Sequence, residues 1–271
     1  MKPINLTFPE GRTKAVTLSY DDGKVSDREM ITIMNKYGLK GTFNISYGTL
    51  GKKGKHLDYL PAEEVGELYQ GHEVACHTYD HETLTRLPKH EMIAEILKNR
   101  KGLEKLVDYP IRGFAYPMGV FNEEVKKILT VCGIEYARTT MHTQRYDLPR
   151  DLLEWSATCH HQDGLLEKTD AFLARNRPSV LDLFYVWGHS YEFVENNNWE
   201  LFTSFCQKVS GKQEIWFATN IEIVDYLAAF QRLIFSADSS FVINPSMTDI
   251  SLLVDGSRQI IAKAGGKTRL D

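Results

Sequence analysis

Apolar runs of strand length alternate with helix-like segments along most of this chain. The helical segments carry end signals, for example a Ser26-x-x-Glu29 capping-box pattern before a helix that Gly38 should end. Such alternation predicts parallel strands covered by helices and joined by right-handed crossovers. We expect seven strands, at residues 15–20, 41–46, 73–76, 111–116, 134–139, 181–187 and 214–219. The sequence therefore predicts an α/β fold with functional residues at the carboxyl ends of its strands.

Two regions depart from this alternation. Residues 140–164 form a polar, His-containing stretch too long for an ordinary connection, so we expect it to be functional or ordered by its own packing. Beyond residue 235, short strand-like runs are joined by turns such as Asp255-Gly256. We therefore divide the chain into one barrel-sized domain at 1–235 and a small C-terminal β extension at 236–271.

Composition argues against several classes of protein. The net charge of the 271 residues is −4, with acidic and basic residues interspersed, which argues against a nucleic-acid partner. The four cysteines are widely spaced, so neither a disulfide framework nor a zinc knuckle is expected. Residues 1–10 lack the apolar stretch of a signal peptide, and no run is long enough to span a bilayer. We therefore expect a soluble, cytoplasmic protein with no membrane partner, acting on a small or neutral ligand.

Two short polar motifs each follow a strand-like run directly: Asp21-Asp22-Gly23 and His77-Thr78-Tyr79-Asp80-His81. Taken alone, the first is a common turn sequence, and the second places two imidazoles on one turn or helix face. Together, at strand ends, they supply one carboxylate and two imidazoles for one metal and leave a second carboxylate as a base. A third strand-end histidine, His189, joins this set. The inventory is typical of a metal-assisted hydrolase.

In this order the motifs resemble those of the NodB-like polysaccharide deacetylases, of the carbohydrate esterase family 4 type. The resemblance covers residues from about 15 to about 225. Four segments carry it: Ser19-Tyr20-Asp21-Asp22-Gly23 for the usual Thr-Phe-Asp-Asp-Gly, His77-Thr78-x-x-His81 for His-Ser/Thr-x-x-His, Phe114-Ala115-Tyr116-Pro117-Met118-Gly119 for Phe-Arg-Pro-Pro-Tyr-Gly, and the buried strand that ends at His189. The resemblance implies an incomplete (β/α)₇ barrel of the NodB-like deacetylase type, here with a short C-terminal β appendage.

The resemblance also implies a role for each matched residue. It implies one divalent metal ion, often zinc in this family although cobalt or nickel can serve, with three ligands: Asp22, His77 and His81. It implies Asp21 as the general base and His189 as the general acid that protonates the leaving amine. The backbone N–H of Met118 would face the developing oxyanion. Base and acid would then come from different strands.

The chain departs from the family pattern at the third motif. Ala115 stands where an arginine commonly orients the catalytic aspartate. Arg112 lies in the same strand but, by its odd spacing, on the opposite face. We therefore take Arg138, at the end of the next strand, as the orienting charge, with a surface position as the alternative.

The fourth motif of the family, usually Asp followed by Trp, has no clear counterpart. Three acidic residues are alternatives as the partner of His189: Asp151, Glu154 and Glu192. His160 and His161 are adjacent, so on an extended segment at most one would enter the site, and a polar surface loop is the other interpretation. Three aromatic residues are candidate contacts for a sugar face: Trp155, Trp187 and Tyr191. Of these, Trp187 lies in so apolar a strand that a core position is the other interpretation.

These observations favour one function and leave two alternatives. The leading hypothesis is a metal-dependent hydrolase that removes N-acetyl groups from an amino sugar, oligosaccharide or polysaccharide and releases acetate. The first alternative is a different hydrolase on the same scaffold, acting on a cyclic imide, a ureide or another small amide. The second is a carbohydrate-binding protein that has kept the scaffold and lost the reaction. The expected partner is thus a carbohydrate or a small amide.

Overall fold

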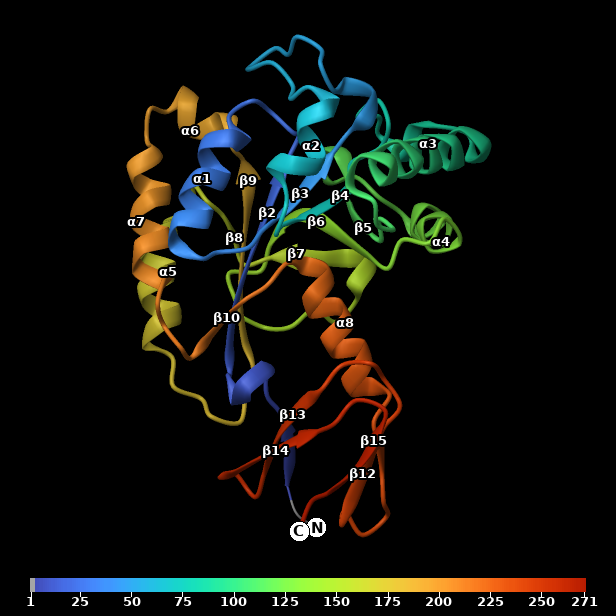
Figure 1. Cartoon of the computed structure of the whole chain (residues 1–271). Helices are drawn as coiled ribbons and strands as arrows, with labels where there is room; N and C mark the ends of the chain where they lie inside the picture. The colour runs from blue at the N-terminus through green and yellow to red at the C-terminus, as the bar shows by residue number, and fades with distance from the viewer. Residues whose placement is uncertain (1–2) are drawn as a thin grey trace.

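A computed structural model describes residues 3–271, and its main element is a parallel sheet curled into a barrel (Figure 1). The strands follow the order β7-β6-β5-β4-β3-β2-β9-β8, and β10 pairs with the first residues of β2. Their bounds are β2 (Lys14–Asp21), β3 (Thr42–Ile45), β4 (Glu73–Cys76), β5 (Gly113–Ala115), β6 (Tyr136–His142), β7 (Trp155–Ala157), β8 (Cys159–His160), β9 (Asp182–His189) and β10 (Ile215–Phe217). Every pairing in this sheet is parallel. The predicted α/β fold of the (β/α)-barrel type is therefore confirmed.

One segment of the chain joins the two ends of the sheet. β7 pairs with β6, β8 pairs with β9, and only Thr158 separates β7 from β8. Thr158 donates its backbone N–H to the carbonyl oxygen of Tyr185 at 2.8 Å, so the barrel is nearly closed. This segment lies within 140–164, where the sequence pattern predicts no strand. Its strands are only three and two residues long, too short for apolar periodicity to reveal.

Helices cover the outside of the barrel (Figure 1). Their bounds are α1 (Asp27–Tyr37), α2 (Ala62–Leu68), α3 (Lys89–Val107), α4 (Glu123–Val131), α5 (Leu165–Ala174), α6 (Tyr191–Glu195), α7 (Trp199–Val209) and α8 (Asn220–Gln231). The apolar faces of most of them pack with outward-facing strand residues in one buried cluster, to which Met30, Ile96 and Phe202 belong. In the described part of the chain no helix combines the length and the apolar character needed to cross a bilayer.

The last helix, α8, begins under the barrel at the amino ends of the strands. Thr219 and Glu222 form a capping box at its start, each side chain accepting the backbone N–H of the other residue. The carboxyl group of Glu73, from β4, accepts the N–H of Ile221 at 2.9 Å and the hydroxyl of Tyr136 at 2.7 Å. Polar groups and a helix N-terminus therefore fill this end of the barrel.

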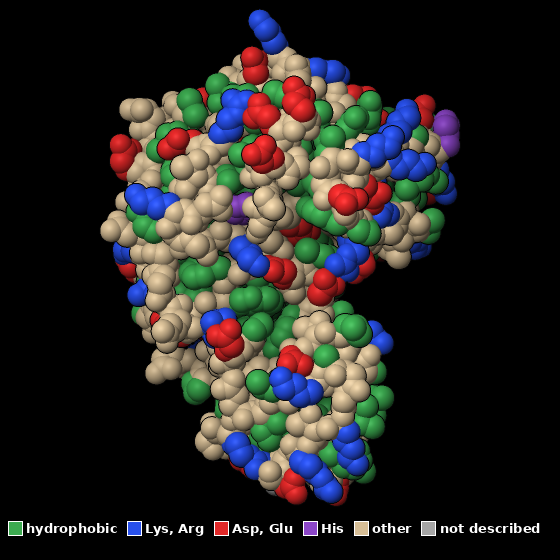
Figure 2. Space-filling model, viewed as in Figure 1, with side chains coloured by type: hydrophobic (Ala, Val, Ile, Leu, Met, Phe, Trp, Pro, Cys, Tyr) green, Lys and Arg blue, Asp and Glu red, His purple; other side chains and the backbone are tan. Residues whose placement is uncertain are grey.

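A separate lobe lies below the barrel, and a notch divides the two on one side (Figures 1 and 2). It holds two antiparallel sheets, β1-β13-β14 and β11-β12-β15. Their bounds are β1 (Ile4–Leu6), β11 (Ile234–Phe235), β12 (Phe241–Asn244), β13 (Ile250–Val254), β14 (Arg258–Ala262) and β15 (Gly266–Arg269). The Tyr226 hydroxyl of α8 donates to the carbonyl oxygen of Thr7 at 2.7 Å and accepts the N–H of Ser251 at 2.9 Å. The lobe thus includes β1, while the domain division at residue 235 stays a prediction.

The start of α1 differs from the predicted capping box. Ser26 forms no side-chain cap, and its hydroxyl lies 2.7 Å from that of Ser190 instead. The end is as predicted, because Gly38 adopts the left-handed conformation with φ 70°. Asp27, fully buried in the first turn, accepts hydrogen bonds from the hydroxyls of Tyr69 and Ser190. Burial raises the pKa of Asp27 to about 7, against the opposite effect of these hydrogen bonds.

The buried carboxyl of Asp27 predicts a pH-dependent stability difference between the wild-type protein and Asp27→Asn. Below about pH 4 the carboxyl is protonated in both folded and unfolded chains. As the pH rises towards about 7, only the unfolded chain loses this proton, so the wild type loses on the order of 2–4 kcal/mol of stability. Denaturant unfolding at about pH 4 and about pH 8 should show this loss relative to the variant. A stability difference independent of pH would contradict the raised pKa.

Candidate metal centre and catalytic site

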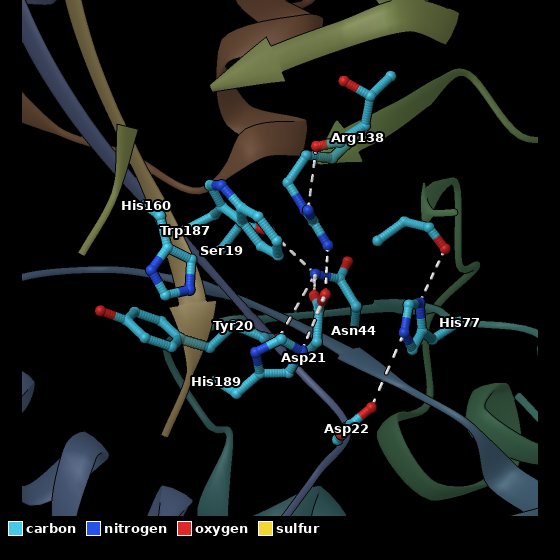
Figure 3. A network of polar contacts seen from close by, with 12 residues as sticks. Ser19, Tyr20, Asp21, Asp22, Asn44, His77, Arg138, His160, Trp187 and His189 are labelled. Atoms are coloured by element: carbon cyan, nitrogen blue, oxygen red, sulfur yellow. Dashed lines mark hydrogen bonds and ion pairs between the residues drawn. The ribbon is translucent and has the colours of Figure 1, made fainter. Parts of the chain in front are cut away.

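Strand β2 carries both aspartates of the first motif to the carboxyl end of the sheet. Asp21 is its last residue, with Asn44 on β3 and His189 on β9 as register partners. Alternation along the strand sends Tyr20 into the helix-facing core and Asp21 into the barrel, where it is 3% exposed. Asp22 has a φ of 83°, and its side chain lies apart from that of Asp21, towards the second motif (Figure 3).

Arg138 of β6 supplies the charge that faces Asp21. Its Nη2 forms an ion pair with Asp21 Oδ2, and the whole side chain is buried. Asn44 Nδ2 donates to Asp21 Oδ1 at 2.8 Å, and the Trp187 ring centroid lies 4.3 Å from the guanidinium carbon. Burial alone would raise the pKa of Asp21, but Arg138 and two nearby histidines bring it below its ordinary value. Asp21 is therefore held as a carboxylate, and Arg138 is not a surface charge.

The second motif places two imidazoles opposite Asp22. Asp22 Oδ1 lies 3.8 Å from His77 Nε2 and 3.6 Å from His81 Nε2. His77 Nδ1 faces the carbonyl oxygen of Ala115 at 2.8 Å, and because that oxygen can only accept, Nδ1 carries the proton and Nε2 offers a lone pair. Burial lowers the pKa of His77 to about 4, which keeps the ring neutral. The three side chains therefore fit a divalent metal ion.

Glu192 is the carboxylate that faces the predicted general acid, His189. Its Oε1 lies 3.4 Å from His189 Nδ1, and its Oε2 accepts the backbone N–H of His189 at 3.2 Å. The other ring nitrogen, Nε2, lies 4.0 Å from Asp21 Oδ2. Burial would lower the pKa of His189, but Glu192 and Asp21 outweigh it and raise the pKa above its ordinary value. His189 thus lies between two carboxylates that favour its protonated form.

Two of the three acidic alternatives have partners elsewhere. Asp151 and Glu154 both pair with Lys126, at 2.7 and 2.5 Å. Glu192 reaches His189 because the chain turns into the short helix α6 directly after β9. The sequence offers Glu192, three residues after His189, as one of three candidates. Only the turn after β9 selects it.

The three candidate aromatic residues do not form one platform. Trp155 is 1% exposed and packs edge-on against two tyrosines in the barrel core. Trp187 lies over the guanidinium of Arg138, and its indole N–H donates to His142 Nε2 at 2.9 Å. Tyr191 stacks on His56 with ring centroids 4.6 Å apart. Of the three, only Tyr191 is paired with an exposed ring.

Both His160 and His161 reach Glu192, which corrects the prediction that at most one of them enters the site. Each Nε2 lies 3.1 Å from Glu192 Oε2, and His161 is only 1% exposed, so the surface-loop interpretation is wrong as well. β8 ends at His160 and the chain turns there, so the alternation of an extended strand does not extend to His161. The polar run Gln162-Asp163-Gly164 is the one local sequence signal for this turn.

The third motif ends in a turn close to the metal-ligand set. Met118 has a φ of 57°, which non-glycine residues rarely adopt, and its side chain is largely exposed. It lies three residues after Ala115, whose carbonyl oxygen holds His77. Gly119 lets this turn approach β6, because a Cβ there would lie 2.0 Å from Thr140 Oγ1. The role of the Met118 N–H stays a prediction.

Comparison with known proteins gives a match to one family over part of the chain. Residues 9–137 match the family model for polysaccharide deacetylase. YxkH of Bacillus subtilis, a candidate polysaccharide deacetylase by its name, is 28% identical over 129 residues, which cover 47% of this chain and 45% of YxkH. A poly-beta-1,6-N-acetyl-D-glucosamine N-deacetylase of Staphylococcus aureus is 26% identical over 183 residues, 61% of either protein. The chain thus spans less than two thirds of these relatives.

Solved structures share the fold. A candidate polysaccharide deacetylase from Mycobacterium smegmatis has a TM-score of 0.63 at 17% identity, covering 85% of this chain and 96% of that one. The peptidoglycan deacetylase PdaC from Bacillus subtilis has a TM-score of 0.55 at 17% identity, covering 82% and 95%. Fold and site define a (β/α)-barrel protein with a carboxylate–imidazole ligand set at the carboxyl ends of its strands. By its match over residues 9–137, the chain resembles the polysaccharide deacetylase family, as its sequence motifs indicate.

Removal of His77 should weaken metal binding, because the hydrogen bond from its Nδ1 to the Ala115 carbonyl oxygen fixes the ring with Nε2 towards Asp22. Loss of an outer hydrogen-bond partner alone costs about 10–100-fold in metal affinity, so loss of the ligand itself should cost at least about 100-fold. Competition with a chelator measures the affinity of the wild type and of His77→Ala for zinc. His90→Ala, which removes an exposed histidine from α3, is the control and should change nothing. Equal affinities for wild type and His77→Ala would contradict this ligand assignment.

Proposed function

We propose that this protein is a metal-dependent hydrolase that removes N-acetyl groups from an amino sugar, oligosaccharide or polysaccharide and releases acetate. The arrangement around Asp21 carries the proposal. Its buried carboxylate lies between the guanidinium of Arg138 and the imidazole of His189, next to the metal-ligand set (Figure 3). The name of the Staphylococcus aureus relative supports a saccharide N-acetyl group as the substrate class.

The chemistry divides among residues from different strands. A divalent metal, when bound, polarises the amide carbonyl and offsets the charge of the developing oxyanion. Asp21 accepts the proton of the attacking water, while Arg138 and Asn44 hold its two oxygens in a fixed orientation. His189 donates a proton from Nε2 to the amide nitrogen, because the amine is too basic to leave unprotonated. The backbone N–H of Met118 donates to the oxyanion.

The metal we propose is zinc, with cobalt or nickel able to replace it, because one carboxylate and two imidazoles suit these ions.

Acetate release should therefore be detected with at least one substrate from a panel of N-acetylglucosamine, chitin oligomers, peptidoglycan fragments and acetylated xylan. A chelator should abolish the release, and added zinc, cobalt or nickel should restore it. No release by folded, metal-loaded protein would contradict the proposal and direct assays to cyclic imides and small amides.

Replacing Asp21 by Asn should separate catalysis from metal binding. The amide keeps the shape of the side chain and cannot act as a base, so turnover should fall by about 10²–10⁴-fold while metal affinity stays close to that of the wild type. Acetate release and metal titration are measured on the same samples, with thermal unfolding to verify the fold around Arg138. Asp80→Asn, an exposed position between the two histidine ligands, is the matched control and should keep full activity. An active Asp21→Asn protein would exclude Asp21 as the base.

A further inference from the structure

A second group of histidines lies beside the proposed general acid. We call it the Glu192 cluster, and its members are Glu192, His160, His161 and His189. Ligand atoms of the first three lie within 4.8 Å of one another, a spacing that also suits a metal ion. Two interpretations of the cluster therefore compete, a second metal site and a set of hydrogen bonds to one carboxylate. The proton positions on the two rings decide between them.

The partners of each ring place its proton. His160 Nδ1 lies 3.2 Å from the backbone N–H of Gln162 and must accept it, so the proton of a neutral ring is on Nε2. His161 Nδ1 is buried, and among the described residues it has no hydrogen-bond partner. A proton there would be an unpaired buried N–H, which proteins almost always avoid, whereas Nε2 points at Glu192 Oε2, 3.1 Å away. Both rings thus present an Nε2–H donor to Glu192.

The contrast with the metal-ligand set supports this assignment. His77 donates Nδ1–H to a backbone carbonyl, which leaves its Nε2 free to bind a metal. His160 and His161 have the opposite tautomer, and residues 3–271 offer neither ring an acceptor for an Nδ1–H. These proton positions favour contacts from both rings to one carboxylate over a second metal site.

We propose that His160 and His161 act as two neutral N–H donors that hold the Glu192 carboxylate in place and so position His189, the proton donor of the reaction proposed above. The division of the carboxylate oxygens supports this. Both imidazole Nε2 atoms lie 3.1 Å from Oε2, which also accepts the backbone N–H of His189, while Oε1 faces His189 Nδ1 at 3.4 Å. The ring of His189 then directs Nε2 towards Asp21 Oδ2, 4.0 Å away.

Neutral donors suit this task better than cations would. A charged residue on Glu192 would offset its negative charge and weaken the attraction that keeps His189 protonated. Burial lowers the pKa of His161 to about 3, so this ring remains neutral at physiological pH. Packing fixes it as well, because it stacks on Phe193 with ring centroids 4.1 Å apart and lies so close to Gly188 that a Cβ there would be 2.0 Å from its Nδ1. His160 and His161 are positioning residues, since Glu192 stands between them and His189.

The test crosses two substitutions with two substrates. His161→Gln keeps an N–H donor near the position of Nε2 and loses the ring, whereas His161→Phe keeps the ring stack and loses the donor. The substrates are the N-acetyl saccharide that the wild type hydrolyses and 4-nitrophenyl acetate, whose leaving group departs without protonation. Loss of the donor should lower kcat for the amide by about 10–100-fold, as partial loss of general-acid catalysis, with less than about threefold change on the ester. His161→Gln should retain most of the amide activity.

The opposite result overturns the proposal. If His161→Phe keeps amide activity while His161→Gln loses it, the residue acts by packing alone, and equal losses on both substrates would also indicate a structural role. His160→Gln and His160→Leu repeat the comparison at a more accessible position, in case His161→Phe does not fold. His90→Gln on the exposed face of α3 is the matched control and should leave both activities unchanged.

A second measurement does not depend on activity. In ¹⁵N-labelled protein, imidazole resonances should show the Nε2–H tautomer for His160 and His161 and the Nδ1–H tautomer for His77. The zinc-loaded protein should contain one metal equivalent, and His160→Gln should leave that number unchanged. Nδ1–H tautomers, or a second equivalent lost in His160→Gln, would overturn the inference. A wild type that releases no acetate would instead count against the proposed function and leave the tautomer result standing.

Discussion

The parallel register between β2 and β9 is the constraint on which the site depends. The two strands pair from Lys14 with Asp182 to Asp21 with His189, over the full length of both. The last pair places the proposed base and the proposed acid side by side, although they are 168 positions apart in the chain. A shift by one residue would turn Asp21 out of the barrel, away from Arg138. The long ladder of backbone hydrogen bonds below this pair prevents such a shift.

Burial sorts the acidic groups of the barrel into two kinds. Asp21 faces a guanidinium and Glu192 faces histidine donors, and both have a pKa below the ordinary value despite the burial that raises it. Asp27 and Glu73 receive hydroxyl and amide donors and form no ion pair with the described residues, and burial raises the pKa of each to about 7. Charge is therefore retained on the carboxylates that face a guanidinium or histidines, as the proposed reaction needs, and reduced on those that receive only neutral donors.

Local sequence patterns predict the fold and the choice of Arg138, and they fail where long-range contacts decide the local structure. Strand–helix alternation was sufficient for the fold, and strand spacing was sufficient to choose Arg138 over Arg112, which pairs with Glu135 and Asp225 instead. The capping box at Ser26 fails because a distant hydroxyl, that of Ser190, competes for the side chain. The strands β7 and β8 were missed because they are stabilised by pairing with β6 and β9 and not by their own periodicity.

The sequence by itself determined the order of strands and helices and the motifs at the strand ends, because apolar periodicity and turn residues act over a few positions. Tertiary structure alone decided which carboxylate faces His189 and which tautomers His160 and His161 adopt. Those outcomes follow from the turns after β8 and β9 and from the burial that the nearly closed barrel imposes. Hydrogen-bond partners and desolvation depend on groups far apart in the chain, so no local pattern encodes them.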